Sequence, residues 1–258
     1  MSLLSYFNES GVGIIEMNSP PANSYGIDFI RELDGAIDAA ERDSNCRAVV
    51  VRSAVPGFFC GGADIKRFGA NTPRGNKEMI ALAHETLGKM VQSEKMYIAE
   101  IAGHALGGGF EIALTCDLRF AAAGKYRLGL PEVTLGILPG HGGTQRLPAL
   151  VGVSKALELM TLGTRLLPEE ALALGLVNRI YSEGELREQT MAVATTLSNS
   201  ATLAIGKIKR TVYDGFYPTM AAGMAVERHN IGILFDSADA EEGFTAFGER
   251  RKPKYAGK

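Results

Sequence analysis

Three clusters of glycine interrupt this chain, and they constrain its fold more than any other feature. The clusters are Gly61-Gly62, Gly107-Gly108-Gly109 and the group formed by Gly140, Gly142 and Gly143. Glycine adopts backbone conformations that other residues avoid, and it lets the main chain approach other atoms closely. Each cluster therefore predicts a tight turn or a place where backbone groups bind a ligand.

Short strands and helices alternate in the first half of the chain. Strand patterns cover residues 13–17, 48–51, 96–102 and 118–122, and helical patterns cover residues 27–41, 79–91 and 107–114. The strand at 48–51 is apolar on both faces, as in parallel sheets. This order predicts an α/β core with right-handed crossovers. The polar stretch 71–76 is expected to be a surface loop.

The second half of the chain is mainly helical. Only residues 176–180 look extended there, and apolar spacing predicts helices at 143–150, 155–162, 168–174, 185–197, 201–213, 219–234 and 238–249. Late helices of this length favour packing between subunits as well as onto the core.

Composition excludes several classes of protein. The 27 basic and 29 acidic side chains leave a net charge of −2, without the basic excess of a duplex-binding protein. No apolar stretch reaches the roughly 18 residues of a membrane span, and the first residues do not resemble a secretory signal. Three cysteines without a CxxC motif argue against a disulfide scaffold or zinc ribbon. A cytoplasmic protein without a bound metal is expected.

The absence of several known catalytic motifs excludes further classes of enzyme. The chain lacks a P-loop, a dinucleotide fingerprint, a GxSxG elbow and an HExxH motif. Its four histidines show no metal-ligand spacing. Only His141 stands out, because it lies among glycines.

Groups that could take part in a reaction lie in or near the glycine clusters. A glycine triplet at the start of a helix leaves N–H groups free to bind an oxyanion, and Gly108 lies in that triplet. Glu111 follows on the same helix face, Ala63 offers a second exposed N–H, and Glu132 stands in an apolar loop. The residues alone leave two interpretations open: a site for chemistry beside a carbonyl group, or tight turns with solvated glutamates.

Three segments, residues 59–66, 103–111 and 129–145, closely resemble the crotonase superfamily, the enoyl-CoA hydratase/isomerase family. The resemblance covers nearly the whole chain, from Pro21-Ala22-Asn23 to the C-terminal helix. It implies the family's α/β fold, a spiral of ββα units over residues 1–197. It also implies a C-terminal helical region over residues 198–258 that forms homotrimers, which commonly pair into hexamers.

The resemblance also assigns the candidate catalytic residues. Ala63 and Gly108 match the two N–H donors that hold the thioester carbonyl of an acyl-CoA. Glu111 and Glu132 match the two catalytic glutamates of hydratases, and Gly140 matches a glycine that helps place the water. The implied reaction is hydration of trans-2-enoyl-CoA, as in fatty-acid β-oxidation. Coenzyme A enters as part of the substrate, and no cofactor is permanently bound.

The positions that bind coenzyme A match the family less closely than the catalytic positions do. Pro20 stands where hydratases often have Lys, Arg250 stands where they more often have Lys, and Leu130 replaces a polar residue. Lys66 matches a position near the nucleotide, and Phe247 and Arg250 match positions that reach the CoA of a neighbouring subunit. The implied substrate-binding set is Pro21, Ala22, Gly62, Asp64, Ile65, Lys66, Phe247 and Arg250.

The environments suggest how the two glutamates divide the work. The helix N-terminus beside Glu111 favours its charged form, and the apolar loop around Glu132 favours the protonated acid. Glu111 would then activate water and Glu132 would protonate C2. Alternatives are a Δ3,Δ2-enoyl-CoA isomerase that uses Glu132, a specialised acyl-CoA lyase or hydrolase of the same fold, and a non-catalytic RNA-binding relative using the basic runs 207–210 and 250–254.

Overall fold

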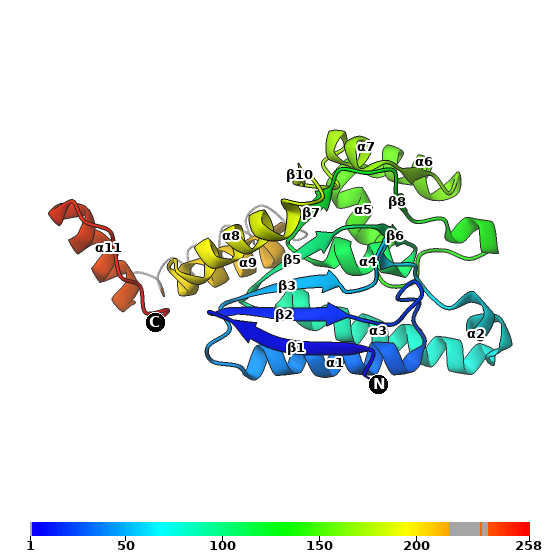
Figure 1. Cartoon of the computed structure of the whole chain (residues 1–258), viewed down its shortest axis with the longest axis horizontal. Helices are drawn as coiled ribbons and strands as arrows, with labels where there is room; N and C mark the ends of the chain where they lie inside the picture. Colours follow the sequence, from blue (N-terminus) through cyan, green and yellow to red (C-terminus); the bar gives the residue numbers. More distant parts are fainter. Residues whose placement is uncertain (1, 217–232, 234–236) are drawn as a thin grey trace.

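Two β-sheets form the centre of the molecule (Figure 1). The computed structural model describes residues 2–216, 233 and 237–258, without the side chains of residues 244, 247 and 248. The first sheet has the order β1 (Leu4–Glu9), β2 (Val12–Met17), β3 (Ala48–Ser53), β5 (Met96–Ile101), β7 (Leu118–Ala122) and β10 (Arg179–Tyr181). The second has the order β4 (Phe58–Cys60), β6 (His104–Leu106), β8 (Leu128–Gly129) and β9 (Arg165–Leu166).

From β3 to β8, consecutive strands alternate between the two sheets, and this alternation produces a spiral. Strands β3, β5 and β7 are parallel neighbours in the first sheet, and β4, β6 and β8 are parallel neighbours in the second. A helical segment returns the chain after each pair: α2 (Ile65–Ala70) and α3 (Pro73–Gln92) after β4, α4 (Gly108–Thr115) after β6, and η1 (Glu132–Leu135), α5 (Gly143–Val151) and α6 (Val153–Thr161) after β8. Each turn of the spiral is a ββα unit.

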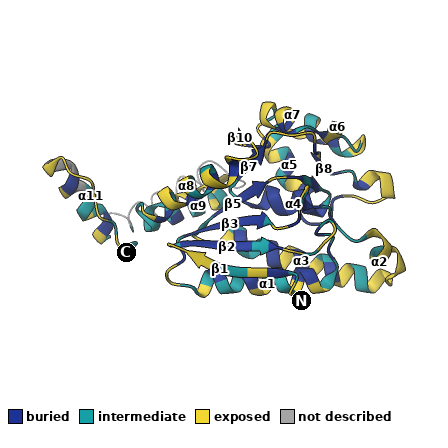
Figure 2. Cartoon of the chain, viewed as in Figure 1, coloured by how far each residue is buried: buried dark blue, intermediate teal, exposed yellow. Residues whose placement is uncertain are grey.

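Apolar burial holds this spiral together (Figure 2). The side chains of Ala48 to Val51 are all inaccessible to solvent, as a central parallel strand requires. Helix α1 (Ile27–Arg42) packs against α3 through its buried stripe, which includes Phe29, Leu33 and Ile37. Helix α8 (Leu186–Ser198) packs across β2, β3, β5 and β7.

The C-terminal part of the chain is helical and includes α7 (Pro168–Ala173), α9 (Thr202–Phe216) and α11 (Ala238–Glu249). Lys209 anchors α9 to the core, because its buried ammonium donates to the Met90 and Lys95 carbonyls and to the Asp117 carboxylate at 2.8 Å each. Helix α11 stands apart from the two sheets in Figure 1. In the part of the chain that the structure describes, no helix is long and apolar enough to cross a membrane.

The α/β core and the long helices confirm the predictions, and three details were wrong or missed. Of the predicted loop 71–76, only Asn71 and Thr72 connect α2 to α3, and residues 73–76 are helical. Thr72 caps α3 through its hydroxyl, and Pro73 occupies the first turn, where its missing N–H has no cost. In the segment 176–180 the strand begins only at Arg179. The short strands of the second sheet escaped prediction because two or three residues show no period. The predicted helix 219–234 lies outside the described residues apart from residue 233, and the division at residue 198 stays a prediction.

Candidate active site

The three glycine-rich segments meet at one edge of the second sheet. Residues 61–63 follow β4, residues 107–108 follow β6, and residues 130–132 follow β8. Because these strands are parallel neighbours, their carboxyl ends lie side by side. This edge is where ligands bind in open α/β sheets.

A cavity of about 320 Å³ opens at this edge. The exposed side chains of Ile65, Ile137 and Leu138 form part of its lining, so the rim is apolar. Predicted site residues that line it are Gly62, Ala63, Ile65, Gly108, Glu111, Glu132 and Gly140. The structure therefore brings together all five residues predicted to be catalytic.

Two backbone N–H groups in this lining have no acceptor in the described part of the chain. The N–H of Ala63 lies between two hydrogen bonds that fix the turn, from the Tyr25 N–H to the Gly62 carbonyl and from the Asp64 N–H to the Tyr25 carbonyl. Gly62 adopts a left-handed conformation with φ +89°, which suits glycine. The N–H of Gly108 is free because Gly108 begins α4. These donors can hold a carbonyl oxygen that gains negative charge.

Glu111 is buried and firmly held. Its Oε1 accepts hydrogen bonds at 2.7 Å from the backbone N–H groups of His141 and Gly143. Gly143 is the first residue of α5, so the carboxylate caps the N-terminus of α5. Burial raises the pKa of Glu111 above its ordinary value, and these two hydrogen bonds offset part of that rise. The charged form of Glu111 stays a prediction, and the N–H groups that bind its carboxylate come from His141 and Gly143 rather than from its own helix.

Glu132 is loosely held by comparison. It begins η1 and is 9% exposed, and its Oε2 has no hydrogen-bond partner among the described residues. Burial raises the pKa of Glu132 to about 7, and the nearby charge of Glu111 contributes to the rise. This agrees with the expectation of a protonated acid in an apolar loop. A β-carbon at Gly107 would lie 3.0 Å from Oε1, so glycine makes room for this carboxyl group.

A buried tyrosine and histidine complete the site, and sequence reasoning singled out only the histidine. The Tyr25 hydroxyl lies 2.9 Å from Nδ1 of His141, although the two residues are 116 positions apart. Both line the cavity and are at most 3% exposed. Burial lowers the pKa of His141 to about 4, so the imidazole is neutral near pH 7. Only the position of Tyr25 just after the Pro21–Asn23 turn could have drawn attention to it.

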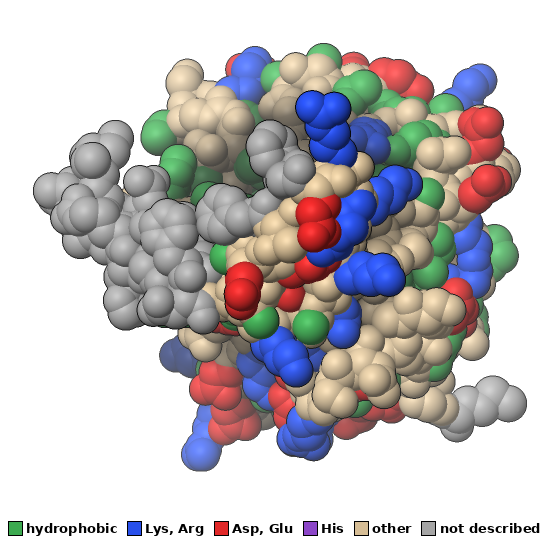
Figure 3. All heavy atoms as spheres, turned by 90° about the vertical axis from the view of Figure 1, so that its left-hand side faces the viewer, with side chains coloured by type: hydrophobic (Ala, Val, Ile, Leu, Met, Phe, Trp, Pro, Cys, Tyr) green, Lys and Arg blue, Asp and Glu red, His purple; other side chains and the backbone are tan. Residues whose placement is uncertain are grey.

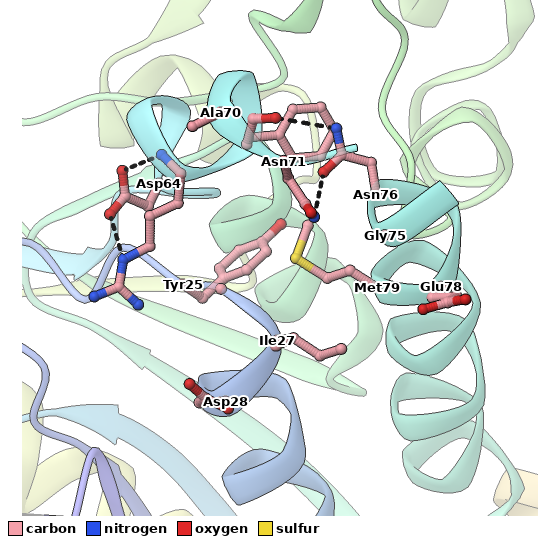
Figure 4. Close-up of a pocket in the computed structure, with 13 residues that line it drawn as sticks. Tyr25, Ile27, Asp28, Asp64, Ala70, Asn71, Gly75, Asn76, Glu78 and Met79 are labelled. Atoms are coloured by element: carbon pink, nitrogen blue, oxygen red, sulfur yellow. Dashed lines mark hydrogen bonds and ion pairs between the residues drawn. The ribbon is translucent and has the colours of Figure 1, made fainter. Parts of the chain in front are cut away.

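A second cavity of about 500 Å³ adjoins the first (Figure 4). Tyr25, Phe68 and Met79 line both cavities. Asp64 is the only predicted binding residue in its lining. The Asp64 carboxylate caps α2 by accepting from the Lys66 and Arg67 N–H groups, so it is occupied by the fold. Glu111 and Glu132 line the first cavity and not this one.

The other predicted binding residues lie farther from the glutamates. Ala22 accepts a hydrogen bond from the Gly61 N–H and so supports the turn before Ala63. Pro21 lines a further cavity of about 500 Å³ beside α1, and Lys66 is exposed on α2. Arg250 is exposed at the end of α11, and the side chain of Phe247 lies outside the described residues. Contacts of these residues with coenzyme A stay predictions.

Ion pairs occupy part of the two basic runs. Figure 3 shows Lys and Arg side chains beside Asp and Glu side chains on the face that corresponds to the left-hand side of Figure 1. Lys207 pairs with Glu94, Lys209 is buried against Asp117, and Arg210 pairs with Asp214. Arg251 pairs with Glu242 and Glu249. Internal ion pairs therefore account for the run 207–210, whereas in the run 250–254 they involve Arg251. Among the described residues, no group of three or more His, Cys, Asp or Glu side chains could hold a metal ion.

Comparison with known proteins gives one consistent result. The family model "Enoyl-CoA hydratase/isomerase" matches residues 8–258. A probable enoyl-CoA hydratase of Bacillus subtilis is 36% identical over the full length of both chains, and a short-chain-enoyl-CoA hydratase of Clostridium acetobutylicum is 37% identical over 95% of this chain and 94% of its own. The crystal structure of a Geobacillus kaustophilus enoyl-CoA hydratase superposes with a TM-score of 0.97 at 41% identity, covering 100% of this chain and 98% of its own.

Proposed function

The chain belongs to the enoyl-CoA hydratase/isomerase family, and we propose that it hydrates trans-2-enoyl-CoA to 3-hydroxyacyl-CoA. The observation that carries this proposal is the pairing of two buried carboxyl groups with two unoccupied N–H donors in one cavity. An isolated carboxylate would support a proton shuttle, whereas addition of water needs both a base and an acid.

The geometry suggests an order of events. The N–H groups of Ala63 and Gly108 polarise the thioester carbonyl, which makes C3 electrophilic and stabilises the enolate that forms. Glu111 removes a proton from water as the water oxygen bonds to C3, and the electron pair of the C2–C3 double bond moves toward the carbonyl. Glu132 then donates its proton to C2. The proton on Glu111 returns to Glu132 through solvent, which restores the resting state.

The pKa directions fit these roles. Glu111 is a stronger base than an exposed carboxylate, because burial raises its pKa while two N–H groups keep it oriented. Glu132 is half protonated near neutral pH, because its pKa is about 7. A group with a pKa near the working pH is best suited to proton transfer. Gly140 lines the same cavity and is proposed to help place the water.

A Δ3,Δ2-enoyl-CoA isomerase is the second candidate function. Its support is the unpartnered Oε2 of Glu132, which is free to move a proton between C2 and C4. A lyase or hydrolase of the same fold is favoured less, because both glutamates are present.

The deciding experiment is the loss of conjugated-thioester absorbance when purified protein is mixed with crotonyl-CoA. We expect rapid loss with the wild-type protein and almost none with Glu132→Gln. If the folded wild-type protein leaves crotonyl-CoA unchanged but converts a 3-enoyl-CoA, the isomerase replaces the hydratase.

We also propose that the chain forms a homotrimer or a dimer of trimers in the cytoplasm. Ile208 and Val212 lie four residues apart on α9 and are 61% and 57% exposed, so they offer apolar surface that a partner subunit could cover. Light scattering after gel filtration should give three or six times the 27.5 kDa chain mass. A monomeric mass would contradict the assembly without affecting the proposed reaction.

A further inference from the structure

Tyr25 contacts the segments that carry both candidate N–H donors. Its N–H and carbonyl bond Gly62 and Asp64, on either side of the Ala63 donor. Its hydroxyl lies against the Gly108 donor, since a β-carbon at Gly108 would come 1.6 Å from the hydroxyl oxygen. Tyr25 therefore lies between the two N–H groups that would hold the substrate carbonyl.

His141 connects Tyr25 to the proposed base. The backbone N–H of His141 donates to Glu111, and its carbonyl accepts from the Arg146 guanidinium at 2.8 Å. The side chain of the same residue reaches the Tyr25 hydroxyl. Glycine-rich loops are intrinsically adaptable, so a side-chain anchor in the loop 140–143 restricts the N–H groups that orient Glu111.

The charge state of His141 also affects Glu111. Nδ1 of His141 lies 3.8 Å from Oε2 of Glu111, so a protonated imidazole would stabilise the carboxylate and weaken it as a base. Burial favours the neutral imidazole, and it also raises the pKa of Tyr25 well above its ordinary value. The pair is thus a hydrogen bond between two neutral groups, which adds order beside Glu111 without adding charge.

We propose that Tyr25 and His141 act together as positioning residues that align Glu111 with the two N–H donors. The inference rests on the proposed hydration, and it adds two residues that the glutamate mechanism does not require. Neither side chain exchanges a proton with the substrate.

The test is a double-mutant cycle on crotonyl-CoA hydration with Tyr25→Phe and His141→Leu. Each change should lower kcat about three- to tenfold while KM stays within twofold, because a lost neutral hydrogen bond is worth about that much. Residues that act as one unit are not additive, so the double variant should be no slower than the slower single variant. His141→Asn, which keeps a polar atom at the position of Nδ1, should recover most of the lost kcat.

Tyr126→Phe is the matched control. Tyr126 is also buried, and its hydroxyl donates to the Ile101 and Ala122 carbonyls, outside the cavity lining. It should lower the melting temperature without changing kcat. Multiplicative losses in the double variant, or losses confined to KM, would overturn the inference.

A readout without turnover separates this inference from the proposed reaction. The imidazole nitrogen signals of His141 should report a neutral ring from pH 6 to 8 and should shift in Tyr25→Phe. A wild-type protein that fails to hydrate crotonyl-CoA overturns the proposed function, and unshifted signals in Tyr25→Phe overturn the pair.

Discussion

Glu111 and Glu132 line the same cavity, yet the structure surrounds them differently. Glu111 is 1% exposed, and one of its oxygens accepts two backbone hydrogen bonds at the start of α5. Glu132 is 9% exposed and has an oxygen without a partner among the described residues. Burial raises the pKa of both groups, so burial alone cannot assign their roles. The difference lies in the backbone donors, which favour an ionised Glu111 and leave Glu132 able to keep its proton.

Replacing each glutamate by glutamine gives the largest expected effect. Glu111→Gln and Glu132→Gln should each lower kcat by roughly 10²–10⁴-fold, the usual contribution of a general acid or base. The two variants should differ in stability. An amide at position 111 can turn only its oxygen toward the two N–H donors, whereas an amide at position 132 resembles the protonated acid. Crotonyl-CoA kinetics and thermal unfolding measure both effects, and near-normal turnover in either variant would contradict the two-glutamate mechanism.

Obstructing an N–H donor should have the next largest effect. In Gly108→Ala the added methyl carbon would meet the Tyr25 hydroxyl at 1.6 Å and His141 Nδ1 at 2.9 Å, so the start of α4 must shift. The rate should fall about 10²–10³-fold, as for the loss of one oxyanion donor. Gly88→Ala on α3 is the control, because its added carbon meets nothing within 4 Å. Equal activity of Gly108→Ala and Gly88→Ala would contradict the role of Gly108 as an oxyanion donor.

These candidate residues could be predicted because local chemistry marks them. A glycine triplet at a helix start and a glycine pair after a strand are visible in the sequence, and so is a glutamate in an apolar loop. The Tyr25–His141 contact joins segments that are far apart in the sequence, and no local sequence pattern predicts it. The same limit explains why the charge on Glu111 was attributed to its own helix. The N–H groups that bind its carboxylate belong to His141 and to Gly143 at the start of α5, which only the folded chain brings near.

Removing the titration of Glu132 should stabilise the protein in alkaline solution. The pKa of this group is about 7 in the folded chain against 4.5 ordinarily, so the folded state holds a proton that the unfolded state releases. Stability is therefore lost as pH rises from about 4.5 to 7 and stays lower above that window. Glu132→Gln avoids this loss and should be more stable at pH 8 by up to about 3 kcal/mol, with little difference at pH 4.

Urea unfolding at the two pH values measures this difference. Glu183→Gln, in an exposed turn, serves as the control and should change stability equally little at both. A Glu132→Gln variant without a pH-dependent gain would show that Glu132 is not held in its acidic form, which would weaken its assignment as the proton donor.

The smallest effect is expected at the rim, where side chains are exposed and would contact only the distal part of the substrate. Lys66 is exposed on α2, the helix whose Ile65 and Phe68 line the cavity. Because an exposed ion pair is worth about 0.2–1 kcal/mol, Lys66→Ala should raise KM by no more than about fivefold and leave kcat within twofold. Added salt should shrink the difference, since it screens exposed charges. Lys125→Ala, also exposed but outside the cavity lining, should leave both constants unchanged. A drop in kcat for Lys66→Ala would mean that this rim residue influences the reacting atoms. Lys66 could then no longer be assigned to substrate binding alone, in contrast to the two glutamates.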